Sequence, residues 1–380
     1  MNYPTVYSVL LQGTRRQILS NEHVSHLQKV NATGGVEPSV IALRHKESLP
    51  KLIARSLESA GCGPADVDAV AVATRPGTVL CLHEGARSAL EFCRRHEKPL
   101  VRVHHMRAHA LTARLVQPQL QFPFLCLLIS GGHAILTLVR GANDFLLLVS
   151  SNGSPGELFD KVARELGFLQ AEEFKNVPGG QALETMAARC PNPPEVLPVH
   201  QQCSLFKQPQ PGRYVGSAHF DFYGMKSQHL TSLTKIREAG EVAVYHTAKR
   251  LGRVMQLLDA HADAPHMPEH RKTLVVSGGV ARNAAFRGAL ERVSTRHGYA
   301  MLCPPASLCS DNGAMIAWAG QETLAAAASA DAASRRLVVP HDELPDELWV
   351  DGKSLIGEDW RQWVDGNLSC VMDMRLPALW

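Results

Sequence analysis

The chain has 380 residues, of which 45% are hydrophobic and 20% are charged. These values are ordinary for an α/β protein with a full core, and the length suggests two domains or one bilobed domain. No eighteen consecutive residues are apolar, so no transmembrane helix and no membrane partner are expected. The net charge of +3 is mild, so any contact with RNA has to be a local patch.

The N-terminal half begins with helical spacing and continues with alternating strands and helices. The residues from 46 to 61 place leucine and isoleucine on one helical face, and Gly61 marks the end. The elements expected after it are a buried strand at 67–74, a helix at 79–96, a strand at 100–103, a helix at 104–115, a buried strand at 122–130, and a hairpin of strands at 134–140 and 145–150.

The C-terminal half continues the alternation after an irregular stretch. A helix is expected at 154–168, and the residues from about 186 to 216 have the composition of a long surface loop. The remaining elements are a helix at 241–261, a strand with a glycine turn at 273–280, a helix at 282–293, a short strand at 300–303 and a helix from 310. Alternating strands and helices indicate α/β layers, and the hairpin indicates a mixed sheet.

Two histidines in HHMRAH have the spacing of metal ligands, although a surface helix that carries histidines by coincidence would have the same spacing, and the chain has eighteen histidines. His105 and His109 are four residues apart on an expected helix, so both imidazoles leave from one face. The pair is not HExxH because Met106 follows the first histidine, which disfavours a metalloprotease. Asp311 begins a later helix, where it is either a favourable N-terminal charge or an oxygen ligand. As a ligand it completes a set of two histidines and one carboxylate, which suits iron or zinc.

Two glycine turns each follow a buried strand. One is Ser130-Gly131-Gly132-His133 and the other is Ser277-Gly278-Gly279-Val280. Glycine lets backbone N–H groups approach a phosphate or a ribose closely, so two such turns suggest a nucleotide site. Strands also often end in glycine without binding anything, and that alternative stays open.

Several charged residues have two readings. Asp160 is either a solvated surface charge or a ribose ligand, and Gly179-Gly180 is a tight turn with Glu184 one helical turn beyond. Basic residues cluster at Arg94, Arg95, Lys98, Arg102 and Arg107, and again at Lys249, Arg250 and Arg253. Charge alone favours ordinary exposed helix faces over RNA contacts.

The nine cysteines do not form a CxxC pair. Cys81, Cys126 and Cys303 lie inside apolar runs, so buried free thiols are expected, with neither a disulfide framework nor a cysteine zinc site. No secretory signal is expected, because no apolar segment of sufficient length follows a basic start. Arg15 and Arg16 are weakly compatible with a mitochondrial transit peptide, although Glu22 follows soon after.

Taken together, these segments resemble one family. The motifs occur in the order seen in the threonylcarbamoyltransferases of tRNA threonylcarbamoyladenosine synthesis, from about residue 33 to about residue 325, and they are HHMRAH, LLISGGH, GELFDK, PGGQALE, FDFYGMKS, SGGVARN and CSDNGAMIAW. PGGQALE and the apolar LLISGGH look most like the mitochondrial branch of the family.

The resemblance implies a two-lobed fold like actin and the sugar kinases, with nucleotide and metal between the lobes. The lobes are expected at 1–121 and 122–330, with a tail at 331–380. The implied metal ligands are His105, His109 and Asp311, and they would hold one divalent ion per subunit, iron or zinc. The implied substrate-binding residues are Leu128, Ile129, Ser130, Gly131, Gly132, Asp160, Gly180, Glu184 and Asn283. Arg282 and Ser310 are implied less strongly, because they flank positions that match the family.

The reaction implied by the resemblance is an acyl transfer. Threonylcarbamoyl-AMP is the donor, and the acceptor is the N6 amine of the adenosine beside the anticodon in tRNAs that read ANN codons. The expected partners are tRNA and a second copy in a homodimer, and the expected compartment is the mitochondrion, or otherwise the cytoplasm. The alternatives are a non-catalytic binder of tRNA or nucleotide and, more weakly, a metallohydrolase.

The chain departs from the family pattern at several places. The family opens with a strand and loop reading like GIETSCDDT, whereas YSVLLQGTRRQ stands here, which leads to the hypothesis of an isoform, a shortened gene model or a divergent copy. Asn152 stands where an aspartate is usual, Glu84 lies in a usually neutral helix, and Arg107 replaces an acidic residue. Losing a central strand would expose sheet edges.

Overall fold

The computed structural model describes residues 5–25, 37–130, 132–151, 153–174, 177–189 and 233–371. The chain forms two compact units. Unit 1 comprises 1–120, 140–145 and 304–357, and unit 2 comprises 121–139, 146–303 and 358–380. The chain therefore returns to unit 1 after passing through unit 2, whereas the sequence suggested boundaries at 121 and 330.

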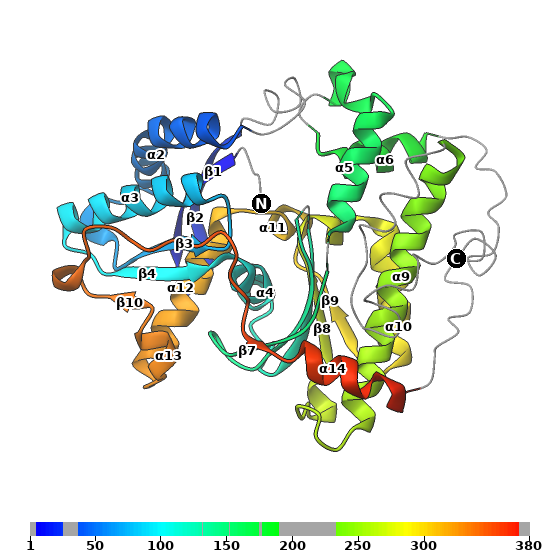
Figure 1. Cartoon of the computed structure of the whole chain (residues 1–380). Helices are drawn as coiled ribbons and strands as arrows, with labels where there is room; N and C mark the ends of the chain where they lie inside the picture. Colours follow the sequence, from blue (N-terminus) through cyan, green and yellow to red (C-terminus); the bar gives the residue numbers. More distant parts are fainter. Residues whose placement is uncertain are drawn as a thin grey trace. The chain divides into compact units, whose positions relative to one another are not determined.

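The described residues of unit 1 form two separate small sheets (Figure 1). β1 (Thr5–Gln12) and β2 (Gln17–Ser25) form an antiparallel hairpin. The second sheet has the order β10-β4-β3, and its strands are β3 (Val70–Arg75), β4 (Leu100–His104) and β10 (Val338–Val339). β3 and β4 run parallel, and β10 runs antiparallel to β4. Among the described strands, this hairpin pairs with neither β3 nor β4.

The helices of unit 1 pack through apolar faces. Within the described residues they are α2 (Pro38–Ala60), α3 (Val79–His96), α4 (His105–Val116), α11 (Ala306–Cys309), α12 (Gly313–Ala328) and α13 (Ala332–Arg335). Gly61 ends α2 in the left-handed conformation, with φ of 63°, as its position in the sequence predicted. Ala89, Leu90 and Cys93 of α3 bury against Leu100 of β4 and Leu348 of the returning segment.

Unit 2 is built on a six-stranded mixed sheet with the order β11-β7-β6-β5-β8-β9. Its strands are β5 (Phe124–Ile129), β6 (Ala134–Val139), β7 (Phe145–Ser150), β8 (Thr273–Ser277), β9 (Ala300–Leu302) and β11 (Glu358–Asp359). β5 pairs antiparallel with β6 and parallel with β8, and every residue of β5 is buried. The expected α/β class and mixed sheet are confirmed.

Within the described residues, the helices of unit 2 are α5 (Pro155–Glu165), α6 (Gly179–Ala188), α9 (Leu233–Ala260), α10 (Ala284–Arg296) and α14 (Arg361–Asn367). Figure 1 shows α9 and α10 side by side, next to β8 and β9, and the two helices are in contact. Much of the expected 186–216 loop, and the FDFYGMKS motif, lie outside the described residues. No helix in the described ranges combines the length and the hydropathy that a bilayer span requires.

Candidate metal centre and nucleotide-binding turns

The two histidines of the candidate metal centre are positioned by a strand that runs directly into a helix. β4 ends at His104 and α4 begins at His105, so His105 and His109 lie one helical turn apart. Their rings meet edge to face, with centroids 4.9 Å apart. The His109 side chain is buried, and the His105 side chain is 12% exposed.

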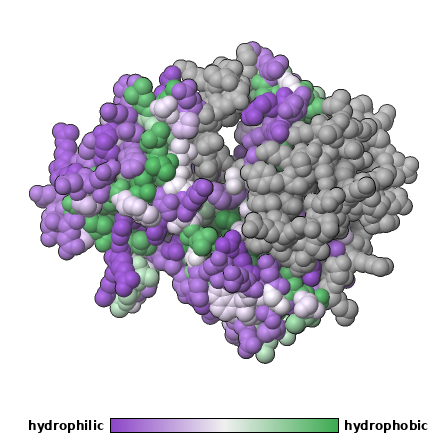
Figure 2. Space-filling model, viewed as in Figure 1, coloured by the Kyte–Doolittle hydropathy of each residue, from purple (hydrophilic) through white to green (hydrophobic). Residues whose placement is uncertain are grey.

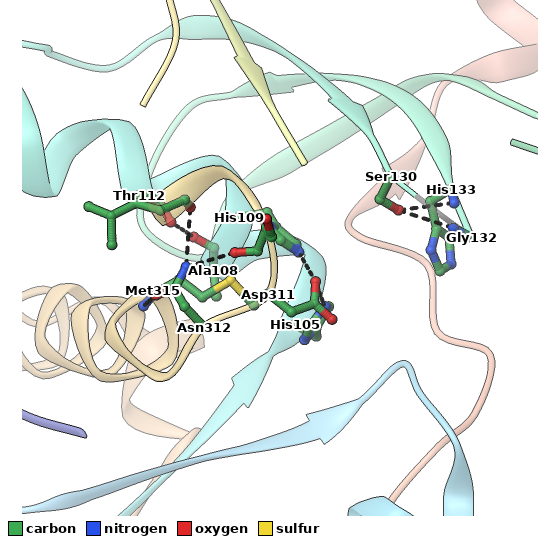
Figure 3. Close-up of polar contacts among 12 residues, drawn as sticks. His105, Ala108, His109, Thr112, Ser130, Gly132, His133, Asp311, Asn312 and Met315 are labelled. Atoms are coloured by element: carbon green, nitrogen blue, oxygen red, sulfur yellow. Dashed lines mark hydrogen bonds and ion pairs between the residues drawn. The ribbon is translucent and has the colours of Figure 1, made fainter. Parts of the chain in front are cut away.

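Asp311 reaches the same place from the turn between α11 and α12. Its Oδ1 lies 2.9 Å from Nε2 of His109 and 3.5 Å from Nε2 of His105 (Figure 3). The neighbouring Asn312 fixes this turn, because its Oδ1 accepts from the N–H of Met315 at 2.9 Å. Its Nδ2 donates to the carbonyl oxygens of Leu308 and Ser310, at 3.2 and 2.8 Å.

The electrostatics of the set favour the protonation states that a metal requires. Burial opposes ionisation of Asp311, but the His105 and His109 imidazoles outweigh it and hold the pKa of the carboxyl below its usual range. Burial lowers the pKa of His109, and Asp311 only partly offsets this. An ionised carboxylate beside a neutral imidazole is the state in which both groups bind a cation.

The three residues fit a single cation. One ligand atom from each of His105, His109 and Asp311 lies within 4.8 Å of the other two. Nitrogen and carboxylate ligands of zinc bind at about 2.0–2.2 Å, so little inward movement is needed. Three protein ligands also leave positions open for substrate. All three residues belong to unit 1.

The two glycine turns of unit 2 lie at neighbouring strand ends. β5 and β8 run parallel, with Leu128 opposite Ser277, so their carboxyl ends meet at one edge of the sheet. Gly278 has φ of 102°, and a Cβ there would lie 2.7 Å from the carbonyl carbon of Ile129. Only glycine permits this approach. Ligands of α/β sheets bind at such edges, outside the carboxyl ends of the strands.

The first of these turns is held by its own serine. Oγ of Ser130 accepts from the N–H groups of Gly132 and His133, at 3.3 and 3.2 Å (Figure 3). The side chains of Leu128 and Ile129 are buried in the core, so only their backbone could contact a nucleotide. Gly131 lies outside the described residues.

Asp160 is tied to the glycine turn that begins α6. The N–H groups of Gly180 and Gly179 donate to its carboxylate, and burial nevertheless raises its pKa. A Cβ on Gly179 would lie 2.7 Å from Cα of Asp160, so glycine is required for α5 and α6 to pack this closely. The sequence alone allowed two interpretations of Asp160, a solvated surface charge and a ribose ligand. The contacts show a carboxylate embedded in a turn.

α6 is joined to the start of α10. Oε1 of Glu184 accepts from the N–H of Ala284 at 3.1 Å. Oδ1 of Asn283 accepts from the N–H of Phe286, also at 3.1 Å, and so caps α10. Arg282 ends the 3-10 turn Gly279–Arg282 that follows β8. The predicted residues Asp160, Gly180, Glu184, Arg282 and Asn283 are therefore linked through α5, α6 and α10 of unit 2, whereas Ser310 belongs to unit 1.

Known proteins match the chain over most of its length. The model of the tRNA N6-adenosine threonylcarbamoyltransferase family matches residues 17–318. This chain belongs to that family. The resemblance implied a two-lobed α/β fold, and the described chain forms two compact units with α/β layers and mixed sheets.

The relatives include bacterial and mitochondrial forms. The tRNA N6-adenosine threonylcarbamoyltransferase of Sinorhizobium medicae is 38% identical over 374 residues, which covers 94% of this chain and 96% of that protein. The mitochondrial form of Homo sapiens is 36% identical, with 77% and 72% covered. Component A of the (R)-2-hydroxyglutaryl-CoA dehydratase of Acidaminococcus fermentans is a structural neighbour with a TM-score of 0.45 and 16% identity, covering 85% and 95%.

Two of the residues interpreted as departures from the family pattern make contacts with residues outside the metal set. Nε of Arg107 donates to the carbonyl oxygen of Ile356 at 2.7 Å, and its guanidinium lies 5.2 Å from the centre of the Phe145 ring. Glu84 pairs with Arg87 at 2.9 Å on α3. Asn152 lies outside the described residues.

One neighbour of the metal set was not anticipated from the sequence. Burial raises the pKa of Tyr7 to about 12, and the charge of Asp311 adds to the effect. Tyr7 lies in β1, in a segment without a family motif, so no sequence pattern pointed to it. His104, by contrast, is turned to the carbonyl oxygen of Leu355, which lies 3.1 Å from its Nε2.

Proposed function

We propose that the protein transfers the threonylcarbamoyl group from threonylcarbamoyl-AMP to the N6 amine of the adenosine beside the anticodon in tRNAs that read ANN codons. The observation that carries the proposal is the convergence of His105, His109 and Asp311. Membership of the family supplies the reaction class and tRNA as the substrate. The tRNA N6-adenosine threonylcarbamoyltransferases that the chain matches support the same assignment.

The transfer requires little covalent chemistry from the protein. The N6 amine attacks the carbamoyl carbon, the bond from that carbon to the phosphate oxygen breaks, AMP leaves with the electron pair, and the amine releases one proton to solvent. AMP is already a good leaving group, so positioning the two reactants supplies much of the rate. We therefore assign no general base among the side chains.

The metal and the nucleotide are assigned to different sets of residues. His105, His109 and Asp311 would hold iron or zinc, one ion per subunit, which polarises the carbamoyl carbonyl when bound. In unit 2, the backbone of Leu128–Gly132, with Gly180, would lie along the adenylate. Asp160, Glu184 and Asn283 would contact its ribose and adenine. Arg282 and Ser310 are weaker assignments.

Complementation tests the function directly. The chain, expressed in a strain that lacks its own enzyme, should restore the threonylcarbamoyl modification of ANN-reading tRNAs, measured by mass spectrometry of tRNA nucleosides. His105→Ala should reduce the modification at least about 100-fold. Loss of a metal ligand should lower activity at least as much as loss of a residue that only orients a ligand. His341→Ala is the matched control, since His341 is exposed and lies in a different turn.

The same experiment separates the alternatives. A folded chain in the right compartment that fails to restore the modification would refute the transferase. If the purified chain binds tRNA but does not use threonylcarbamoyl-AMP, it is a non-catalytic binder. The metallohydrolase has little support, because Met106 stands where a metalloprotease needs its glutamate, and its side chain is buried. An absence of peptidase activity would close that alternative.

We also propose a homodimer located in mitochondria. Apolar side chains on two helices of unit 1 are exposed to solvent: Val40 and Leu43 of α2, and Val79 and Leu80 of α3. Figure 2 shows hydrophobic residues among hydrophilic ones on the visible surface of this unit. Exposed apolar patches often mark interfaces. Several matched relatives are mitochondrial forms. Light scattering of the purified chain and cell fractionation test the two parts separately.

A further inference from the structure

The face of α4 that is turned away from the metal set carries Arg107. Each residue of an α-helix advances by about 100°, so His105 and His109 leave α4 on nearly the same side and Arg107 leaves on the opposite side. Nη1 of Arg107 donates to Oδ1 of Asn143 at 3.4 Å. Arg107 is thus tied to the loop 140–145, which belongs to unit 1.

Asn143 continues this connection to α12 and α13. Its Nδ2 donates to Oγ1 of Thr323 at 3.0 Å and to Oγ of Ser334 at 2.9 Å. Thr323 and Ser334 are both buried, and Thr323 lies on α12, the helix that begins just after Asp311. The side chain of Asn143 therefore joins the helix that carries two of the ligands to the helix that begins beside the third.

The directions of these hydrogen bonds are fixed by their neighbours. Oγ1 of Thr323 already donates to a backbone carbonyl oxygen one turn earlier, at 2.8 Å, and Oγ of Ser334 donates to the carboxylate of Asp331. A hydroxyl group has one hydrogen, so both oxygens can only accept from the amide of Asn143. Arg107 can only donate, so it requires the amide oxygen. The amide therefore fits this position in a single orientation.

A second polar contact joins the same two helices. Nε of Arg114 on α4 lies 2.7 Å from Oε1 of Glu322 on α12, and the two side chains are only 16% and 10% exposed. Arg114 lies about two helical turns beyond Arg107, and Glu322 directly precedes Thr323. The two helices are also in contact. Two links at separate points of α4 oppose a rotation of this helix against α12 that one link alone would allow.

We propose that Asn143 is a positioning residue for the metal set. The link from Arg107 through Asn143 to Thr323 holds α4 and α12 in the arrangement that brings Asp311 to the two histidines. The proposal rests on the metal centre of the proposed function. Arg107 was interpreted as the replacement of an acidic residue, and an ionised acidic side chain has no hydrogen to donate to the amide oxygen.

Zinc binding by the purified chain tests the proposal. Thr323→Val removes the acceptor of Asn143 on α12, and Ser334→Ala removes the acceptor on α13. Both variants should lower Tm, because each leaves an N–H group of Asn143 without its partner. Only Thr323→Val should weaken zinc binding, at least about threefold by calorimetry. Since Ser334→Ala is matched in burial and in the hydrogen bond lost, equal zinc affinities of the two variants would overturn the proposal.

The spectrum of bound Co²⁺ separates positioning from stability. The visible absorption of Co²⁺ depends on the geometry of its ligands. It should therefore change in Asn143→Ala and in Thr323→Val, and it should stay the same in Ser334→Ala. A spectrum of Thr323→Val identical to that of the unsubstituted chain would mean that the ligands keep their arrangement without the link, which would contradict the role of Asn143.

A double variant tests whether the link acts as one unit. Arg107→Met and Thr323→Val break it at its two ends, so the double variant should bind zinc no more weakly than the weaker of the two single variants. Additive losses would mean that the two ends act independently, and they would refute the link.

Failure of the metal centre is recognised separately in the same measurements. If the unsubstituted chain binds neither zinc nor cobalt, the metal centre is refuted, and this proposal with it. If the unsubstituted chain binds zinc and all the variants bind it equally well, the link alone is refuted and the metal centre stands.

Discussion

At the scale of single residues, the candidate metal centre depends on how firmly Asp311 is held. Asp311 lies in the turn that Asn312 fixes through three hydrogen bonds. The sequence predicted His105 and His109 from helical spacing, since residues four apart share a face. It did not predict Asn312, because an asparagine before a helix is common and its second role, orienting the preceding carboxylate, is visible only in three dimensions.

Asn312→Ala tests this role. Loss of the N-cap of α12 should lower the free energy of unfolding by about 1 kcal/mol, measured by urea denaturation. Binding of zinc, measured by calorimetry, should weaken about tenfold because Asp311 is no longer oriented. Asp331→Ala is the control, since Asp331 caps α13 in the same way and is not a member of the metal set. A similar loss of zinc affinity in both variants would contradict the role of Asn312.

Asp160 makes stability depend on pH. Burial raises its pKa, against the opposing N–H groups of Gly180 and Gly179. Between the ordinary and the raised pKa, the folded chain binds more protons than the unfolded chain, so the contribution of Asp160 to stability falls as pH rises from about 4. Asp160→Asn should remove this decline, as followed by thermal unfolding at several pH values. A steeper decline in the variant would show that the sign is wrong.

At the scale of elements, the sequence predicted most of the regular structure. The helix expected at 79–96 is observed as α3 with the same limits, because an amphipathic run there is bounded by Pro76-Gly77 and a polar turn. α9 begins earlier than expected, at Leu233. The sequence does not predict the hairpin of β1 and β2, because the regular hydrophobic spacing that indicates elements begins only at residue 46.

Gly278 tests the contact between the two glycine turns. Gly278→Ala should lower the free energy of unfolding by about 3 kcal/mol or more, because φ is 102° and the new Cβ would collide with the backbone of Ile129. Gly279→Ala is a matched control, since a Cβ there meets no atom within 4 Å. Denaturation monitored by circular dichroism measures both. Equal stability of the two variants would show that the turns do not approach as described.

At the scale of the whole molecule, the sequence did not predict how the chain divides. Local periodicity carries no information about which unit a later helix joins. Residues 304–357 return to unit 1, and with them comes Asp311. The joining of Asp311 to two histidines about 200 residues earlier is therefore a property of the tertiary fold. The resemblance to the family implied that Asp311 joins the two histidines. Its position at the start of a helix, taken alone, allowed either a favourable N-terminal charge or a metal ligand.

The two units should differ in resistance to denaturant. Unit 1 contains a cavity of about 1030 Å³ lined by β1 and β3, and a cavity in the interior lowers stability. Cys93 of unit 1 and Cys126 of unit 2 are both fully buried free thiols, and burial raises the pKa of Cys93 to about 11. In urea, pulsed alkylation followed by mass spectrometry should therefore label Cys93 at lower concentrations than Cys126. Cys370 is exposed and should react without urea. Earlier labelling of Cys126 would contradict the difference.

The return of residues 304–357 to unit 1 also sets an order in protein synthesis. His105 and His109 leave the ribosome long before Asp311, and all of the described sheet of unit 2 except β11 is translated between them. A nascent chain therefore holds only two of the three ligands until more than four-fifths of the protein has been made. We therefore predict that a metal at this site would be acquired late, after most of the described sheet of unit 2 has been translated.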